Sequence, residues 1–451
     1  MPPSASSVAT DQLLRDSFAA ALAAADPLQV LAAHLPEAPP ARVTVVGAGK
    51  AAASMALAVE RHWDGRTALE GVVITRHAHG LPTRWIEVVE AGHPVPDGAG
   101  EQAAAAMLAR ARALGPDDLL LVLISGGGSS LMALPAPGLA MADLKALNRV
   151  LLASGAPIGA MNVVRKHVSA IAGGQLAAAA AANGARVLAL VVSDVTGDDL
   201  SAIASGPCAP DPSTYADAMA IAARYALDLP LAVRAHLERG ARGELPETPK
   251  PGSAVFARVE HRLIVTARAS LDAAREFFLR QDIPAVCLGD SVTGEAREVA
   301  QVYAALVREI RAHAHPWPAP VALLSGGECT VTLRAAAAAG AGGSTGGVGG
   351  AGAAARGGRC SEFLLALGIE LDGMQGVAAL ACDTDGIDGS EENAGAVLHP
   401  DSMARAAACG VNARACLDAH DAWGFFHACG GLVVTGPTRT NVNDYRVILI
   451  R

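Results

Sequence analysis

Lysine and glycine residues that could handle a phosphate meet at the end of an early apolar run. Residues 42–46 read as a strand, and Gly47, Gly49 and Lys50 follow them closely. Glycines let the backbone turn tightly, and the amides of a strand-to-helix turn favour anions. A lysine beside them is a compact positive charge that suits a phosphate in transfer. The alternative is a solvated lysine at a turn that binds nothing.

A second glycine turn follows a longer apolar run. Residues 119–131 read LLLVLISGGGSSL, which predicts a buried parallel strand, a tight turn and a helix. Ser129 could cap that helix, whose first N–H groups attract anions. We therefore expect an anion site formed by Ser125, Gly126, Gly127, Gly128 and Ser129. A glycine turn without a ligand is the alternative, and the similar turn 325–328, which ends in Glu328, makes it less favoured.

Acidic side chains follow the apolar run 187–192. Asp194, Asp198 and Asp199 lie just beyond it. Carboxylates at a strand end suit Mg²⁺, which takes one or two of them together with substrate phosphates. One of them could instead be the base that accepts a hydroxyl proton. We expect Asp194 and Asp198 as metal ligands, or Asp194 as the base. The alternative is an Asp-rich turn in which Asp198 caps a helix.

A further acidic turn, 383–389, resembles a calcium loop but fails the pattern of an EF-hand. Ile387 stands at its fifth position and Ala394 at its twelfth, where Asp or Asn and Glu are required. We interpret it as an acidic turn at a strand end that lines the ligand cleft, with Asp385 as its candidate contact. A plain turn is the alternative.

Two candidate arginines lie in different surroundings. Arg165 stands beside Lys166 and His167, and neighbours on a helix point to different faces, so only some of them can reach one ligand. A solvated helix face is the alternative for this cluster. Arg359 follows two glycines and precedes an apolar stretch that predicts a helix. Its guanidinium can hold a carboxylate or a phosphate through two hydrogen bonds.

The first glycine turn also fits G-x-G-x-x-A, a weak match to the dinucleotide fingerprint. That fingerprint requires an acidic residue after the second strand, where the sequence has Ile74, Thr75 and Arg76. A Walker P-loop is excluded, because Thr44 stands where its first glycine is needed and Ala51 where Ser or Thr is needed.

The elements that must position these residues alternate between strand-like and helix-like stretches. This pattern predicts an α/β fold with a mainly parallel sheet, whose ligands lie beyond the carboxyl ends of the strands. The stretch 240–252 contains three prolines and predicts a loop or linker. We therefore expect one domain over 1–250 and a second α/β domain over 251–451. Within the second, 335–358 is almost wholly Ala and Gly and predicts a mobile insertion.

Composition limits the classes of partner. The 451 residues carry 35 Lys and Arg against 44 Asp and Glu, a net charge of −9, which argues against general nucleic-acid binding. Eight cysteines without a CxxC pair indicate free thiols in a reducing compartment. The first residues lack a signal-peptide pattern, and the Ala-rich run 176–182 is too short to span a membrane. We expect a soluble, cytoplasmic protein with a small-molecule substrate and no membrane partner.

Together the motifs resemble the class II glycerate 2-kinase family. The matching segments span most of the chain in order, and they are 45–51, 124–130, 162–167, 193–199, 203–207, 325–328, 383–389, 436–438 and 440–442. The resemblance implies a Rossmann-like N-terminal domain and a C-terminal MOFRL domain, with the site in the cleft between them. It also implies that ATP donates its γ-phosphate to the 2-hydroxyl of D-glycerate, with a divalent metal for which we expect Mg²⁺.

The same resemblance assigns roles to particular residues. It implies that Lys50 and Arg359 are the functional lysine and arginine, and it adds Asn441 as a candidate contact. One departure is the segment 360–362, which reads Cys-Ser-Glu where the family usually has Asn-Gln-Glu. A homodimer is an open expectation, because the sequence does not fix the oligomeric state.

Two other functions stay open. Many relatives carry the label hydroxypyruvate reductase, which would mean a nicotinamide-dependent oxidoreductase that uses the weak glycine fingerprint, with Arg76 near an NADP phosphate. The third function is a nucleotide- or acid-binding sensor without turnover. It is the least favoured, because the sequence pairs a lysine of catalytic type with several strand-end acids.

Overall fold

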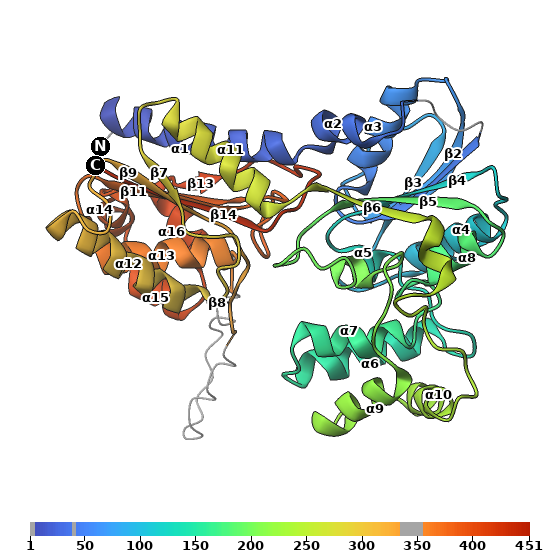
Figure 1. The fold of residues 1–451 in the computed structure, drawn as a ribbon. Coiled ribbons are helices and arrows are strands. Elements are labelled where there is room, and N and C mark those ends of the chain that lie inside the picture. Colours follow the sequence, from blue (N-terminus) through green and yellow to red (C-terminus); the bar gives the residue numbers. More distant parts are fainter. Residues whose placement is uncertain (1–4, 38–41, 334–354) are drawn as a thin grey trace, which may run out of the picture. The chain divides into compact units, whose positions relative to one another are not determined.

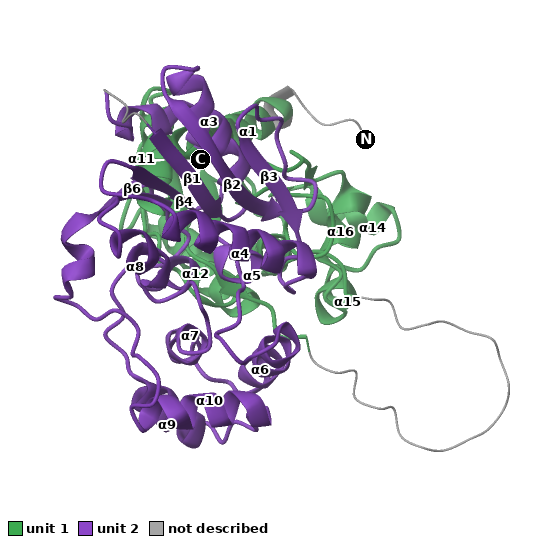
Figure 2. Ribbon diagram, turned by 90° about the vertical axis from the view of Figure 1, so that its right-hand side faces the viewer, with its two compact units in different colours: residues 1–25, 267–438, 443–451 green, residues 26–266, 439–442 purple. Residues whose placement is uncertain are grey.

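The computed structural model of the protein describes residues 5–37, 42–333 and 355–451 (Figure 1). The chain forms two compact units, which Figure 2 colours separately. Unit 1 comprises Met1–Ala25, Ala267–Thr438 and Asn443–Arg451, and unit 2 comprises Asp26–Thr266 and Arg439–Val442. The Ala/Gly insertion expected at 335–358 lies outside the described residues except for its last four. Within the described ranges, no helix has both the length and the apolar character needed to cross a membrane.

Unit 2 is built on a six-stranded parallel sheet in the order β3-β2-β1-β4-β5-β6. The strands are β1 (Arg42–Ala48), β2 (Ala68–Arg76), β3 (Ile86–Ala91), β4 (Leu119–Ile124), β5 (Arg186–Val192) and β6 (Val259–Val265). All side chains of β4 are buried, which explains its unbroken apolar run. The order reverses between β1 and β4, the place at which open parallel sheets bind their ligands. The predicted α/β class with a mainly parallel first sheet is confirmed.

The helices of unit 2 fall into two groups. Those that pack on the sheet are α3 (Ala52–Trp63), α4 (Gly98–Arg112) and α8 (Gln175–Ala181). A separate helical group has its own core of Leu144, Leu147, Val164, Tyr215 and Leu237, among others. Its members are α6 (Met141–Ala153), α7 (Ile158–Lys166), α9 (Tyr215–Arg224) and α10 (Leu231–Ala241), seen together in Figure 1. The short helices are α2 (Pro27–Val30), η1 (Leu31–His34), α5 (Gly128–Leu131), η2 (Ile203–Ser205) and η3 (Ala254–Arg258).

Unit 1 contains a second six-stranded sheet, in the order β13-β12-β11-β14-β9-β7. Its strands are β7 (Ala285–Cys287), β9 (Val321–Ser325), β11 (Val377–Asp383), β12 (Gly395–Leu398), β13 (Leu432–Val433) and β14 (Asp444–Ile450), and the short strands β8 (Gly294–Glu295) and β10 (Cys329–Thr330) pair with each other. Every described pair of the larger sheet is antiparallel except β7 with β9. The second domain is therefore α/β in content but mainly antiparallel in its sheet.

Helices cover both faces of the unit 1 sheet. On one face α1 (Ala5–Ala25) and α11 (Ala267–Leu279) share a core with β11 and β14. On the other face lie α12 (Ala296–His313), α13 (Arg359–Leu371) and α16 (Ala422–Cys429), with α14 (Ser402–Ala408) and α15 (Ala413–Asp418) beside them (Figure 1). Ten consecutive residues of α13, from Cys360 to Ile369, include seven hydrophobic ones, and these belong to that second core or pack against it.

The two compact units are not separated at the domain boundary that we expected near residue 250. Unit 2 instead runs over Asp26–Thr266 and includes Arg439–Val442. The segment after residue 250 forms β6, which pairs in parallel with β5 and so completes the sheet of unit 2. At the other end of the chain, α1 belongs to unit 1, because the Tyr445 hydroxyl donates to Ser17 Oγ at 2.8 Å and the Ser270 hydroxyl donates to the Ala21 carbonyl at 2.8 Å. Sequence order alone could not reveal this pairing of the first helix with the last strand.

The Ser17 contact gives a test of this placement. In Ser17→Ala the hydroxyl of the fully buried Tyr445 loses its acceptor, so we expect the free energy of unfolding to fall by about 1–3 kcal/mol. Adding Tyr445→Phe removes the orphaned hydroxyl and should restore part of that loss. Denaturant titrations of the two single variants and the double variant measure the coupling. Additive effects of the two substitutions would contradict the contact.

Candidate functional site

The turns that follow β1 and β4 lie against each other in unit 2. The amide of Lys50 donates to the Gly126 carbonyl at 2.9 Å, and the amide of Ala51 donates to Ser125 Oγ at 3.0 Å. A Cβ at Gly49 would lie 2.1 Å from Ser125 Oγ, so only glycine allows this approach. Ser125 is fully buried, and its hydroxyl joins the two turns.

The first turn does not offer its amides to a ligand. Gly49 donates to the Ile74 carbonyl, Lys50 to Gly126, Ala51 to Ser125 and Ala52 to the Gly49 carbonyl. The anion cradle predicted around Gly47 and Gly49 is therefore not available. These glycines have a packing role instead, since a Cβ at Gly47 would lie 2.2 Å from the Leu123 carbonyl oxygen. The role predicted for Lys50 therefore rests on its side chain and not on its amide.

The second turn, in contrast, contains backbone amides that donate no hydrogen bond within the described structure. In the described structure, the N–H groups of Gly126, Gly127 and Ser129 donate to no acceptor, whereas that of Gly128 donates to the Ser125 carbonyl at 3.3 Å. Gly127 has a φ of 81°, the left-handed region that favours glycine. Free N–H groups in such a turn form a concave anion-binding surface. The turn after β4 therefore has the free donors that an anion site requires, and the predicted site at Ser125, Gly126, Gly127, Gly128 and Ser129 stays a prediction.

Lys50 and Asp194 border this second turn. A Cβ at Gly127 would lie 3.6 Å from Lys50 Cγ, and one at Gly126 would lie 2.2 Å from Asp194 Oδ2. The Gly126 probe position is also 2.2 Å from Asn441 Nδ2, which donates to Asp194 Oδ2 at 3.3 Å. Side chains from two distant parts of the sequence therefore meet at the backbone of Gly126, and Lys50 lies beside the next residue, Gly127.

Asp198 does not join this group by any described contact. Its φ is 54°, and its amide donates to the Val195 carbonyl at 3.0 Å. Within the described ranges, no cluster of three or more His, Cys, Asp or Glu side chains is arranged to hold a metal ion. Of the two predicted metal ligands, only Asp194 lies at the glycine turn.

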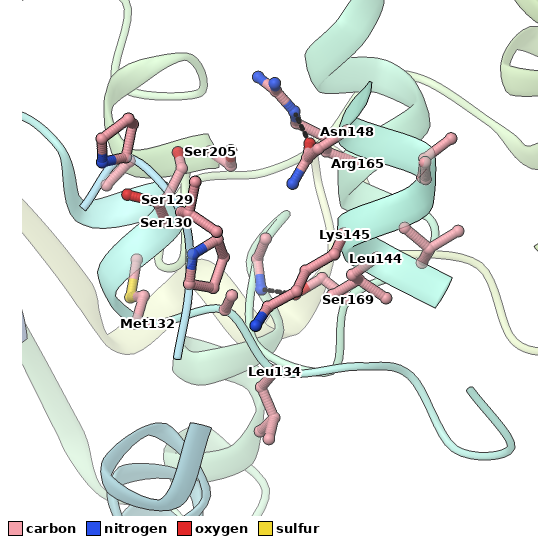
Figure 3. Close-up of a pocket in the computed structure, with 18 of the residues that line it drawn as sticks. Ser129, Ser130, Met132, Leu134, Leu144, Lys145, Asn148, Arg165, Ser169 and Ser205 are labelled. Atoms are coloured by element: carbon pink, nitrogen blue, oxygen red, sulfur yellow. Dashed lines mark hydrogen bonds between the residues drawn. The ribbon is translucent and has the colours of Figure 1, made fainter. Parts of the chain in front are cut away.

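A cavity of about 650 Å³ opens on the other side of the same turn and is shown in Figure 3. Gly127 and Ser129 lie on its wall, as does Ser205, whose hydroxyl is 2.8 Å from that of Ser129. Arg165 also lines the cavity and donates from Nε to Asn148 Oδ1 at 2.9 Å. Burial lowers the pKa of Arg165. The predicted Arg165 and Ser129 thus share one cavity.

Several residues that line the cavity are not among the predicted site residues. Asn148, Lys145 and Ser205 line the cavity with Arg165, and His93 lies beside Gly127, where a Cβ would be 2.8 Å from His93 Nε2. Ser205 stands in a segment that resembles the family, which was the one available signal. Lys145 and Asn148 lie on a helix whose polar residues look like an ordinary solvated face.

Arg359 lies in unit 1, at the first position of α13. It donates from Nη2 to Asp383 Oδ2 at 2.7 Å and from Nε to Asp444 Oδ1 at 2.8 Å, and Glu328 lies 3.5 Å from Nη2. Burial alone would lower the pKa of Arg359, but Asp444, Asp383 and Glu328 raise it further than burial lowers it. The fork expected to hold a substrate carboxylate is therefore largely occupied, and in the described structure only Nη1 donates to no acceptor.

Neighbouring side chains fix the position of Arg359. The buried Asp388 accepts from the amides of Cys360 and Ser361 at 2.9 and 2.8 Å and so caps α13. Burial raises the pKa of Asp388, although these hydrogen bonds oppose the rise. Asp385 is buried too, and its Oδ1 accepts from the Ile387 amide at 2.8 Å. The segment 360–362, which departs from the family's usual Asn-Gln-Glu, thus lies in the first turn of α13, where Asp388 binds two of its amides.

Two family models match the chain. One described as "Domain of unknown function (DUF4147)" matches residues 13–238, and one described as "MOFRL family" matches residues 321–444. A protein of Agrobacterium vitis with the provisional name hydroxypyruvate reductase is 48% identical over 98% of this chain and 95% of its own. "Glycerate 2-kinase" of Pyrococcus horikoshii is 36% identical over 91% of this chain and 87% of its own.

A solved structure is also similar over the full length. The crystal structure of glycerate kinase from Thermotoga maritima aligns with a TM-score of 0.84 at 34% identity, and the alignment covers 98% of this chain and 100% of that chain. Both the sequence relatives and this structure therefore span the two units described above. The chain belongs to the class II glycerate 2-kinase family.

Proposed function

We propose that the protein is an ATP-dependent glycerate 2-kinase, which transfers the γ-phosphate of ATP to the 2-hydroxyl of D-glycerate. The observation that carries the proposal is the turn at Gly126, where free amides, the Lys50 side chain and the Asp194 carboxylate gather. The choice of substrate is supported by the kinases of P. horikoshii and T. maritima, which are similar over at least nine-tenths of this chain.

Phosphoryl transfer requires mainly positioning and neutralisation of charge. The amides of Gly126, Gly127 and Ser129 are suited to hold phosphate oxygens, and Lys50 to offset the charge that develops on them. As the bond between the γ-phosphorus and ADP breaks, a new bond forms to the 2-oxygen of glycerate. Asp194 is suited to accept the proton that this hydroxyl loses.

Asp194 also fits as a ligand of Mg²⁺. The ion in such sites needs only one or two carboxylates, because substrate phosphates and water complete its coordination. The close approach of Gly126 to Asp194 leaves the carboxylate directly beside the free amides. When bound, Mg²⁺ would neutralise charge on the phosphate oxygens. The second predicted ligand, Asp198, stays a prediction without a supporting contact.

The Nη1 atom of Arg359 is the part of this side chain that we propose for substrate binding. Asp383 and Asp444 hold the other side of the guanidinium, so its orientation is set before any substrate arrives. A preset cation loses little freedom when it binds an anion, which favours a small substrate such as glycerate. We propose that Nη1 donates to the glycerate carboxylate. Glu328 contacts Arg359, and Asn441 contacts Asp194, while the direct substrate contacts predicted for Glu328, Asp385 and Asn441 stay predictions.

A nicotinamide-dependent reductase is less well supported. Such an enzyme would hold a pyrophosphate on the amides of the first glycine turn, and those amides are used within the fold. The strand β2 ends at Arg76, so no acidic residue follows there to bind a ribose hydroxyl.

A cytoplasmic location is part of the proposal. All eight cysteines are described and none forms a disulfide, as expected in a reducing compartment. The homodimer stays a prediction that awaits measurement of the mass in solution.

A coupled assay tests the proposed reaction. Purified protein with D-glycerate, ATP and Mg²⁺ should form ADP, and omission of either glycerate or Mg²⁺ should abolish it. The same protein with hydroxypyruvate and NADH or NADPH should oxidise no nicotinamide above background. Reduction of hydroxypyruvate without ATP turnover would overturn the proposal.

Gly126→Ala tests the turn directly. The new methyl group would overlap Asp194 Oδ2 and Asn441 Nδ2, so we expect kcat/KM for glycerate to fall on the order of 10²–10³-fold. Gly159→Ala is the matched control, because its Cβ meets nothing within 4 Å on helix α7. Steady-state kinetics on both variants, with melting curves, make the comparison. Equal activity of the two variants would exclude Gly126 from the site.

Arg359→Lys tests the occupied fork. A lysine cannot bridge Asp383 and Asp444 and still present a further donor in a fixed direction. We expect both a lower unfolding midpoint and about a tenfold to hundredfold loss in kcat/KM. Arg308→Lys, which alters an exposed pair with Glu370, should change neither. A fully stable and active Arg359→Lys would show that the fork geometry has no role.

A further inference from the structure

Two buried carboxylates face each other across neighbouring strands of the unit 1 sheet. Asp383 at the end of β11 is the cross-strand partner of Asp444 at the start of β14, and each residue is only 2% exposed. Like charges at directly opposite positions of a sheet repel each other, and little water reaches this pair to screen the repulsion. The pair therefore requires positive charge beside it.

Arg359 bridges these carboxylates, but one guanidinium cannot balance two of them. It donates from Nη2 to Asp383 Oδ2 at 2.7 Å and from Nε to Asp444 Oδ1 at 2.8 Å. Without another cation, the three groups together would carry a net negative charge and would repel a substrate carboxylate. The role proposed for Nη1 of Arg359 therefore requires a second cation.

Arg446 is that second cation. Residues two apart on a strand point to the same face of the sheet, so Arg446 of β14 lies beside Asp444. Its Nη2 donates to Asp444 Oδ2, whereas Arg359 binds Oδ1, so each carboxylate oxygen of Asp444 has its own guanidinium. Arg446 is only 1% exposed, so water cannot take its place beside Asp444. Two carboxylates and two guanidiniums thus balance each other inside unit 1.

Arg446 also fixes the turn that carries a third acidic neighbour of Arg359. Its Nη1 donates to the Gly326 carbonyl at 2.9 Å and its Nη2 to Cys329 Sγ at 3.2 Å, on either side of Glu328 in the sequence. Glu328 lies 3.5 Å from Nη2 of Arg359, and water screens much of its charge because its side chain is 55% exposed. Arg446 thus restrains this acidic segment as well as its direct partner on β14.

We propose that Arg446 is a positioning residue of the kinase, which neutralises and holds Asp444 so that Nη1 of Arg359 keeps its direction and its charge for the substrate carboxylate. The inference rests on the proposed function, because that function gives Arg359 an anionic partner. Without the charge of Arg446, Asp444 Oδ2 would lose its cation and would draw the guanidinium of Arg359 toward itself. Glycerate would then bind more weakly, although every group proposed to touch it would still be present.

Arg446→Gln removes the charge but keeps an amide that can donate to Asp444 Oδ2. We expect the KM for D-glycerate to rise about tenfold to hundredfold, the range for loss of a hydrogen bond to a charged group, and the KM for ATP to stay within about twofold of the original. Arg446→Lys keeps a positive charge beside Asp444 and should recover most of the loss. Initial rates give both KM values, and titration calorimetry gives the affinity for D-glycerate without turnover.

Arg297→Gln is the matched control in the same unit. Arg297 donates from Nε and Nη2 to Glu362 Oε1 on α13, at 2.9 and 2.7 Å, but no described contact of Arg297 reaches the carboxylates around Arg359. Its loss should lower the unfolding midpoint and leave the KM for D-glycerate unchanged. If Arg446→Gln gives this same pattern, Arg446 has only a structural role and the inference is overturned.

A second variant decides the matter if Arg446→Gln does not fold. The double variant Arg446→Gln with Asp444→Asn removes both members of the buried ion pair and leaves neither charge without its partner. A KM for D-glycerate within about threefold of the original would sustain the action of Arg446 through Asp444, and a rise of about tenfold or more would overturn it.

Failure of the proposed function gives a different result. If the unaltered protein phosphorylates no D-glycerate, the proposed substrate is wrong, and a crystal structure of Arg446→Gln then decides the inference. A guanidinium of Arg359 that has turned toward Asp444 Oδ2 would sustain it, and a guanidinium in its original position would overturn it.

Discussion

Two hydrogen bonds between neighbouring turns hold the unit 2 site together. The amides of Lys50 and Ala51 donate to Gly126 and Ser125, and these bonds tie the end of β1 to the end of β4. Because they use the amides of the first turn, the second turn alone offers donors to an anion. They also set the backbone of Gly126 against Asp194 and bring the Lys50 side chain to Gly127. A fixed backbone supplies donors that need no reorganisation when charge develops.

A second fixed arrangement surrounds Asp444 in unit 1. Its carboxylate accepts from Arg359 and from the fully buried Arg446, whose Nη1 also donates to the Gly326 carbonyl at 2.9 Å. Removal of one partner from a buried ion pair typically costs about 3–5 kcal/mol, because a charge is left uncompensated. The glycine turn 325–328 therefore owes its position to an arginine more than a hundred residues later. The cluster gives unit 1 a rigid guanidinium at the start of α13.

Much of the fold could be predicted from the sequence, because its signals are local. The apolar run of β4 and the glycines after it predict a buried parallel strand and a tight turn, and both are present. The antiparallel sheet of unit 1 could not be predicted, since alternation of strand and helix carries no information about strand direction. The acceptors of Lys50 and Arg359 also lay beyond prediction, because Gly126 and Asp444 are distant in sequence. Lys145 gave no signal, since a lysine on an amphipathic helix is usually solvated.

The return of the chain into unit 2 has a consequence for biosynthesis. Arg439–Val442 belongs to unit 2, where the Arg439 carbonyl accepts from Ser54 at 2.7 Å and Asn441 donates to Asp194. A ribosome produces this tetrapeptide only after it has made the long unit 1 segment Ala267–Thr438. Nascent domains generally fold in order of synthesis. The parallel sheet can therefore form long before the last four residues of unit 2, Arg439–Val442, are synthesised. A chain that is terminated before Arg439 would contain all six strands of the parallel sheet but would lack Asn441 beside Asp194, so completion of this polar group must wait for the synthesis of unit 1 up to Thr438.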